Sequence, residues 1–164
     1  MSFVSRLRTL LPALWAGWML SVAAVGTSSA FALLQGPDAG RLVGRMLAIE
    51  AYTALGFGVT LLVLERLSAR HAVSAGQGSQ FSLGMVLALA ALFCTIAGYF
   101  ALLPMMDAAR AGQGPLSFGQ LHAISAGCFG LKIILVLVLA WRNAASQNGA
   151  TPAPATSLSR QRAS

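Results

Sequence analysis

Apolar residues along the chain fall into four long stretches that are joined by short polar links. No Asp, Glu, Lys or Arg lies between Arg8 and Asp38, and the third stretch carries none either. The second and fourth stretches are each interrupted once, by Glu50 and by Lys132. Because a membrane-spanning helix needs about 20 predominantly apolar residues, the pattern predicts four spanning helices. We place them at about residues 10–34, 44–65, 81–104 and 118–141.

These spans predict an all-α fold, an integral membrane four-helix bundle. Pro104 marks the expected end of the third helix, since proline is disfavoured inside a helix and restricts the residue before it. Residues 1–9 form a basic N-terminal segment. Residues 143–164 change abruptly to Ala, Ser, Thr, Pro and Gln, so we expect a disordered cytoplasmic tail that has nothing to bury.

Composition supports the bilayer as the main partner. The chain is 57% hydrophobic and only 9% charged, whereas soluble domains carry about 25% charged residues. This excludes an ordinary soluble enzyme. The net charge of +7 does not indicate nucleic-acid binding, because the basic residues sit singly at the ends of apolar runs and form no patch with interleaved aromatics.

The flanking arginines predict an orientation, because cytoplasmic segments retain positive charge during insertion. Five arginines flank one side of the membrane and three flank the other: Arg6, Arg8, Arg66, Arg70 and Arg142 against Arg41, Arg45 and Arg110. We therefore expect a bacterial inner-membrane protein with both termini in the cytoplasm. In an alternative interpretation, Ala30-Phe31-Ala32 is a signal-peptide cleavage site, although the preceding uncharged run is longer than the 7–15 residues of a signal sequence.

Ionisable side chains within the spans are the candidates for a functional site, because each is costly in hydrocarbon. From the helical rise, Glu50 lies about 7 Å and His122 about 6 Å below the outer face. The two would form a hydrogen bond or ion pair if their helices are neighbours; otherwise each reaches separately toward headgroups or water. With Ser125 and Arg110, they define a candidate polar pocket open to the outer side.

Lys132 lies deeper in the membrane than Glu50. Its long side chain is expected to reach the cytoplasmic headgroups, with Glu65 or Thr60 as possible partners. A pair between Lys132 and Glu50 is not expected, because their estimated depths differ by more than about 10 Å.

Small residues on the fourth helix predict how it packs. Gly119, Ala123 and Gly127 recur every four residues, and such ridges let helix backbones approach closely. If this ridge faces inward, it carries His122 toward the interior of the bundle, near the outer surface.

Methionines near the outer surface offer a second use for the same histidine. Met46, Met105 and Met106 lie close in depth to His122, and soft sulfur ligands suit Cu(I). A copper or haem site built from these residues is therefore an alternative to the common role of methionine as an adaptable filler between helices.

Four segments resemble those of a known family: LWAGW in the first helix, AGRLVGR before the second, LPMMDAAR after the third and SFGQLHAIS at the start of the fourth. The chain resembles, over about residues 10–142, a bacterial family of uncharacterised four-helix membrane proteins related to the eukaryotic transmembrane-protein-205 group. The most specific element is Phe118-x-x-Leu121-His122-x-x-Ser125. The family often has a proline before the position of Phe31, where this chain has serines instead. The resemblance implies an inner-membrane bundle without an assigned activity.

Two functions follow from the sequence. The first is a structural or accessory membrane protein without a cofactor, in a homo-oligomer or beside another membrane protein. The alternative is binding or transport of copper or haem at the outer face, through His122 with Glu50 and the methionines. An enzyme is not expected, because one histidine and one carboxylate supply neither a nucleophile nor a second acid.

Overall fold

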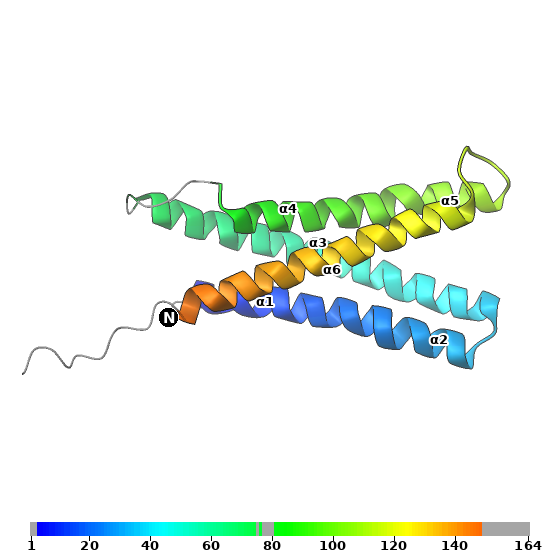
Figure 1. Cartoon of the computed structure of the whole chain (residues 1–164), viewed down its shortest axis with the longest axis horizontal. Helices are drawn as coiled ribbons and strands as arrows, with labels where there is room; N and C mark the ends of the chain where they lie inside the picture. The colour runs from blue at the N-terminus through cyan, green and yellow to red at the C-terminus, as the bar shows by residue number, and fades with distance from the viewer. Residues whose placement is uncertain (1–2, 75, 77–80, 149–164) are drawn as a thin grey trace, which may run out of the picture.

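The computed structural model describes residues 3–74, 76 and 81–148, and within these all regular secondary structure is helical. The elements form four long rods (Figure 1). In chain order they are α1 (Phe3–Leu20), η1 (Ser21–Gly26), α2 (Thr27–Leu33), α3 (Gly36–Ser74), α4 (Leu83–Thr95), η2 (Ile96–Ala101), α5 (Leu102–Arg110) and α6 (Phe118–Asn148), where η marks a π-helical turn.

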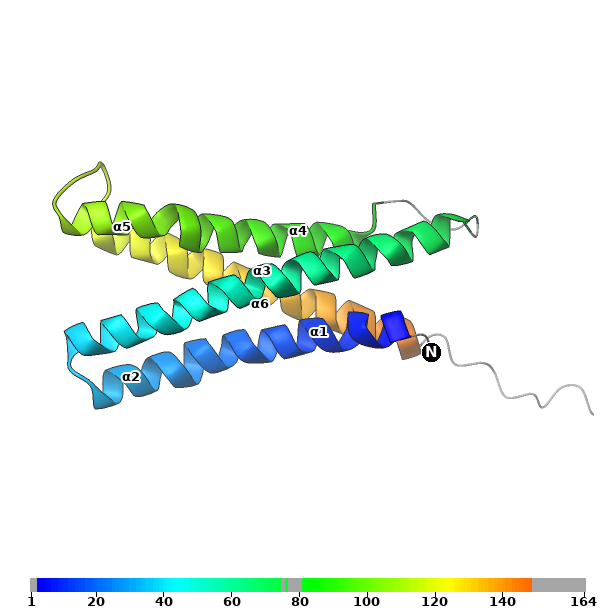
Figure 2. The same ribbon diagram turned by 180° about the vertical axis from the view of Figure 1, so that it is seen from behind.

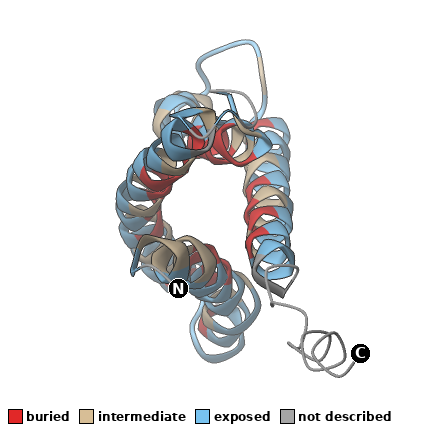
Figure 3. Ribbon diagram, turned by 90° about the vertical axis from the view of Figure 1, so that its left-hand side faces the viewer, coloured by how far each residue is buried: buried red, intermediate tan, exposed pale blue. Residues whose placement is uncertain are grey.

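All four rods are long and apolar enough to cross a membrane, over Phe3–Leu33, Gly36–His71, Leu83–Arg110 and Phe118–Ser146. This confirms the all-α fold with four candidate transmembrane helices. α1 packs against α3 and α6, and α4 packs against the same two helices. α3 and α6 are therefore diagonal partners, and buried residues face the interior of the ring (Figure 3). Below, the Arg8 end is the end that holds the N-terminus, and the Arg110 end is the opposite one.

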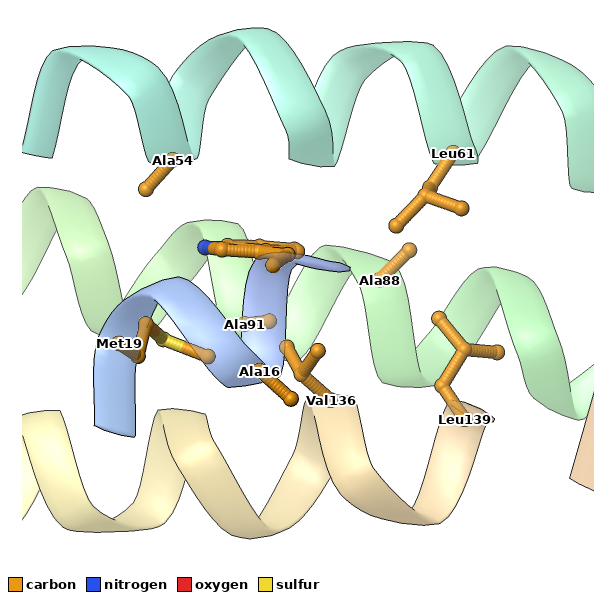
Figure 4. Close-up of a cluster of buried hydrophobic side chains, with 9 residues drawn as sticks. Ala16, Met19, Ala54, Leu61, Ala88, Ala91, Val136 and Leu139 are labelled. Atoms are coloured by element: carbon orange, nitrogen blue, oxygen red, sulfur yellow. The ribbon is translucent and has the colours of Figure 1, made fainter. Parts of the chain in front are cut away.

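The apolar core lies in the half of the bundle toward the Arg8 end. Trp15 of α1 is completely buried, and its ring stacks on Phe57 of α3 with centroids 6.0 Å apart. Residues from all four rods complete the cluster: Ala16, Met19, Ala54, Leu61, Ala88, Ala91, Val136 and Leu139 (Figure 4). Four alanines in this cluster leave room for the large indole ring, so the helices approach closely around a single tryptophan.

Toward the Arg110 end the rods separate into two pairs. α2 stays beside the start of α3, and α5 stays beside the start of α6 (Figures 1 and 2). We expected the small-residue ridge of α6 to face the interior. This prediction is wrong, because Gly119, Ala123 and Gly127 are all exposed. α6 instead turns inward the face that carries Leu121, Lys132, Val136 and Leu139.

The sequence suggested that the third helix ends at Pro104, and this is wrong. The rod continues to Arg110, and Pro104 lies in the first turn of α5. Proline is tolerated there because the first backbone N–H groups of a helix have no carbonyl partner within it. The π-helical turn η2 directly precedes this point, and the N–H of Leu102 reaches back to the carbonyl of Ala97. The regular ladder is thus already interrupted where the proline ring has to fit.

The two ends of the described chain also differ from the sequence expectation. The basic segment 1–9 is helical from Phe3 onward and belongs to the first rod. The prediction of a disordered tail from residue 143 is wrong for residues 143–148, because α6 continues through Asn148. Asn143 is only 7% exposed and has buried hydrogen-bond partners, which a composition-based view of the tail could not include. Residues 149–164 lie outside the described part of the chain.

Gly98 allows the closest approach between η2 and α6. A Cβ at this position would lie 2.8 Å from the Cβ of Cys128, whereas a Cβ at Gly127 would meet no atom within 4 Å. We expect Gly98→Ala to lower the melting temperature in detergent, because overpacking costs about 1–3 kcal/mol and exceeds the gain of up to about 1 kcal/mol in helix propensity. Gly127→Ala is the matched control and should melt at or above the wild-type temperature. Equal melting of the two variants would contradict this packing.

Candidate functional site

A charged pair lies in the interior of the bundle between α3 and α6. The Nζ of Lys132 donates to both carboxylate oxygens of Glu50, at 3.0 and 2.8 Å. The two side chains are only 3% and 2% exposed. Within the membrane, this contact satisfies two groups that would each be costly alone.

The aromatic ring of Phe129 completes the surroundings of Lys132. The Nζ lies 4.7 Å from the centre of this ring, within the range in which a cation is attracted to the face of an aromatic ring. The ammonium therefore has two carboxylate acceptors and one aromatic face. A buried ion pair is stable only when its geometry is good and its remaining polar atoms have partners, and this arrangement meets much of that requirement.

The pair corrects two expectations about Lys132. It binds Glu50, and its partner is neither Glu65 nor Thr60, which lie further toward the Arg8 end. The reason is where the two helices begin. α3 begins at Gly36 and α6 at Phe118, both at the Arg110 end, so Glu50 and Lys132 each lie 14 residues along their helices and at about the same level of the bundle. The expected depth of Glu50 was measured from Arg45, which lies nine residues inside α3.

A second network joins all four rods at the Arg8 end. Arg8 donates to both oxygens of Glu65, at 3.0 and 2.8 Å, in the two-bond geometry typical of strong arginine–carboxylate pairs. The amide of Asn143 donates to the carbonyl of Arg8 at 2.7 Å and to Glu65 at 3.3 Å. The hydroxyl of Ser82, which caps α4, lies 3.5 Å from Glu65. One buried carboxylate thus connects α1, α3, α6 and the start of α4.

Gly84 provides the space that Glu65 occupies. A Cβ at this position would collide with the Glu65 carboxylate. The glycine in the first turn of α4 is therefore part of the network, although it contributes no polar group. Neither Gly84 nor Asn143 was identified from the sequence. Both lie within or beside apolar or small-residue segments, where nothing in the local pattern signals a carboxylate from another helix.

His122 is not the partner of Glu50. It is exposed on α6, and its ring stacks on Phe118 with centroids 5.8 Å apart. Arg110 also contacts Phe118, and its guanidinium carbon lies 4.5 Å from the centre of the Phe118 ring. The expected Glu50–His122 pair is therefore wrong, because Glu50 is buried in the bundle with Lys132 while His122 faces outward.

The remaining members of the candidate polar pocket have local roles. The hydroxyl of Ser125 donates to the backbone carbonyl of Gly98 at 2.6 Å, and so links α6 to η2. Arg110 forms an exposed salt bridge with Asp107 at 2.9 Å. The structure therefore does not bring His122, Glu50, Ser125 and Arg110 together as one pocket.

The candidate metal ligands are spread over three helices, α3, α5 and α6. Met46 packs over Gly26 of η1, which belongs to the α2–α3 side of the bundle. Met105 is exposed and Met106 is buried on α5, while His122 stacks on Phe118. Over residues 3–74, 76 and 81–148, no group of three or more His, Cys, Asp or Glu side chains could hold a metal ion.

The fold and its buried charges define a multi-pass membrane protein with four candidate transmembrane helices. Residues 10–114 match the family described as a domain of unknown function, DUF4149, and the chain belongs to that family. No curated protein and no solved structure matches the chain. Glu50 and Glu65 lie inside the matched region, whereas their partners Lys132 and Arg8 lie outside it.

We expect each single removal of the Glu50–Lys132 charges to destabilise the bundle strongly. Glu50→Leu or Lys132→Met leaves one buried charge without a partner, at a cost of about 3–5 kcal/mol. The double variant should recover most of the stability, because an apolar pair of similar volume is often as stable as a buried ion pair. Chemical unfolding in detergent measures all three.

Removal of the exposed Asp38–Arg41 pair is the control for this cycle. Its loss should change the unfolding free energy by less than about 1 kcal/mol. A double variant of Glu50 and Lys132 that is no more stable than the single ones would contradict the pairing.

Proposed function

We propose that the protein is a structural or accessory component of the bacterial inner membrane and not an enzyme. The observation that supports this proposal is that both buried carboxylates are already occupied. Glu50 accepts two hydrogen bonds from Lys132, and Glu65 accepts two from Arg8. Such closed pairs hold helices in one arrangement, whereas a binding site keeps polar groups available for a ligand.

The two networks act at different levels of the membrane. The Arg8 network fixes the ends of the helices, and the Glu50–Lys132 pair joins the diagonal helices further along. Polar contacts between apolar helices select one register among many of similar packing energy. A bundle held in this way is suited to present a constant lipid-facing surface to a second copy or to another membrane protein. We also propose kinship with the eukaryotic transmembrane-protein-205 group, on the motifs that run from the first helix to the fourth.

Copper or haem binding at the outer face is the alternative, and metal content distinguishes the two functions. Protein purified from cells grown with added copper should carry substoichiometric copper and no haem absorbance. This expectation rests on three contacts: Met46 packs over Gly26, Met106 is buried, and the His122 ring stacks on Phe118. Stoichiometric copper or haem that disappears in His122→Ala, but remains in His71→Ala, would overturn the structural function in favour of the alternative.

We propose that the Arg8 end faces the cytoplasm, because five of the eight arginines that flank the spans lie at that end. Fusion of green fluorescent protein after Asn148 should then give fluorescent cells. Alkaline phosphatase at the same position should be inactive, since it folds only outside the cytoplasm. The control is an insertion between Gly112 and Gln113, where the two reporters should behave in the opposite way. Active phosphatase after Asn148 would reverse the orientation.

A further inference from the structure

Of the three arginines at the Arg110 end, Arg45 is the one that has no acidic partner among the described residues. The chain has four Asp and Glu residues, and the structure describes all of them. Each has another basic partner: Asp38 binds Arg41, Glu50 binds Lys132, Glu65 binds Arg8 and Asp107 binds Arg110. Arg45 is exposed on α3. An anion that pairs with it must therefore come from outside the described chain.

The position of Arg45 along α3 indicates where that anion lies. The Arg8 network contains Glu65, and Arg45 precedes Glu65 by five and a half turns of the same helix, which is about 30 Å. This matches the thickness of the hydrocarbon layer, about 30 Å. If the Arg8 network marks one boundary of this layer, Arg45 lies at the opposite boundary. Its side chain leans toward the N-terminus of α3, and so toward the lipid headgroups at the Arg110 end.

Three aromatic residues lie on the side of the bundle that carries Arg45. Tyr52 of α3 contacts Phe100 of η2 edge to face at 5.4 Å, and Tyr99 contacts the same ring at 5.1 Å. Arg45 lies seven residues before Tyr52 on α3, which places the two side chains on the same exposed face of that helix. From the contact at Phe100, α3 and α5 diverge toward the Arg110 end (Figures 1 and 2). Arg45 and the two tyrosines, all of which carry hydrogen-bond donors, thus lie on the side of the bundle where the helices part.

We propose that Arg45, with the hydroxyl groups of Tyr52 and Tyr99, binds the phosphate of an anionic phospholipid at this membrane boundary. A guanidinium matches the geometry of a phosphate with two parallel hydrogen bonds. Tyrosine is favoured at the same level because its ring lies in the apolar layer while its hydroxyl reaches the headgroups. The aromatic contact at Phe100 offers an apolar surface to the acyl chains of the same lipid. A lipid satisfies both requirements, whereas a free phosphate ion satisfies only the first.

Lipid binding to the full-length protein in detergent tests this site. Native mass spectrometry would measure retention of added phosphatidylglycerol by the wild type, Arg45→Gln and Arg41→Gln. We expect Arg45→Gln to weaken binding about fivefold, the effect of one basic side chain near an anionic lipid. Arg41→Gln is the matched control. It removes the same charge one turn before Arg45, but Arg41 is already paired with Asp38. It should leave binding unchanged.

Two further measurements keep the test decisive. Arg45→Lys retains the charge but loses the two-bond geometry, so it should bind the lipid more weakly than the wild type even if Arg45→Gln does not fold. Sodium phosphate should displace the lipid no better than sodium chloride of equal ionic strength. Equal loss in Arg45→Gln and Arg41→Gln, wild-type binding by Arg45→Lys, or selective displacement by phosphate would each overturn the proposal.

Discussion

The ion pair between Glu50 and Lys132 connects two helices that lie diagonally across the bundle. α3 and α6 are diagonal in the ring, and each packs mainly on α1 and α4. Their charged side chains cross the interior and meet at 2.8 Å. In hydrocarbon, neither charge has water as an alternative partner, so any arrangement of the four rods has to bring these two residues together. This requirement excludes most other ways of packing four apolar helices.

The distribution of charge follows the same constraint throughout the molecule. Four acidic side chains are matched by four basic ones, two pairs inside the bundle and two on its surface. The buried pairs join different rods, whereas the exposed pairs join residues three positions apart on one helix. Interior charges thus help to fix how the helices pack together, whereas each surface pair stabilises only the helix that carries it. The excess of arginine remains available to the membrane surfaces.

The apolar pattern was sufficient to predict the four helices but not their partners. Long uncharged runs specify spanning helices because only helices satisfy their own backbone in lipid. The pattern contains no information about which face of α6 turns inward, and the ridge of Gly119 and Gly127 pointed to the wrong face. The candidate site failed for a related reason. Depth measured from Arg45 paired Glu50 with His122, whereas the start of α3 at Gly36 brings Glu50 level with Lys132. Asn143 fell in a segment that looked like a tail.

The separation of 82 residues between Glu50 and Lys132 has a consequence for biosynthesis. The second helix reaches the membrane well before the fourth has been translated, so Glu50 enters the insertion machinery without its counter-charge. A nascent chain with three helices therefore carries a carboxylate whose charge has no partner in hydrocarbon. The last helix brings both Lys132 and Asn143, so it supplies the missing partner of Glu50 and completes the network around Glu65. The charges of the bundle are thus matched only after the fourth helix has been synthesised.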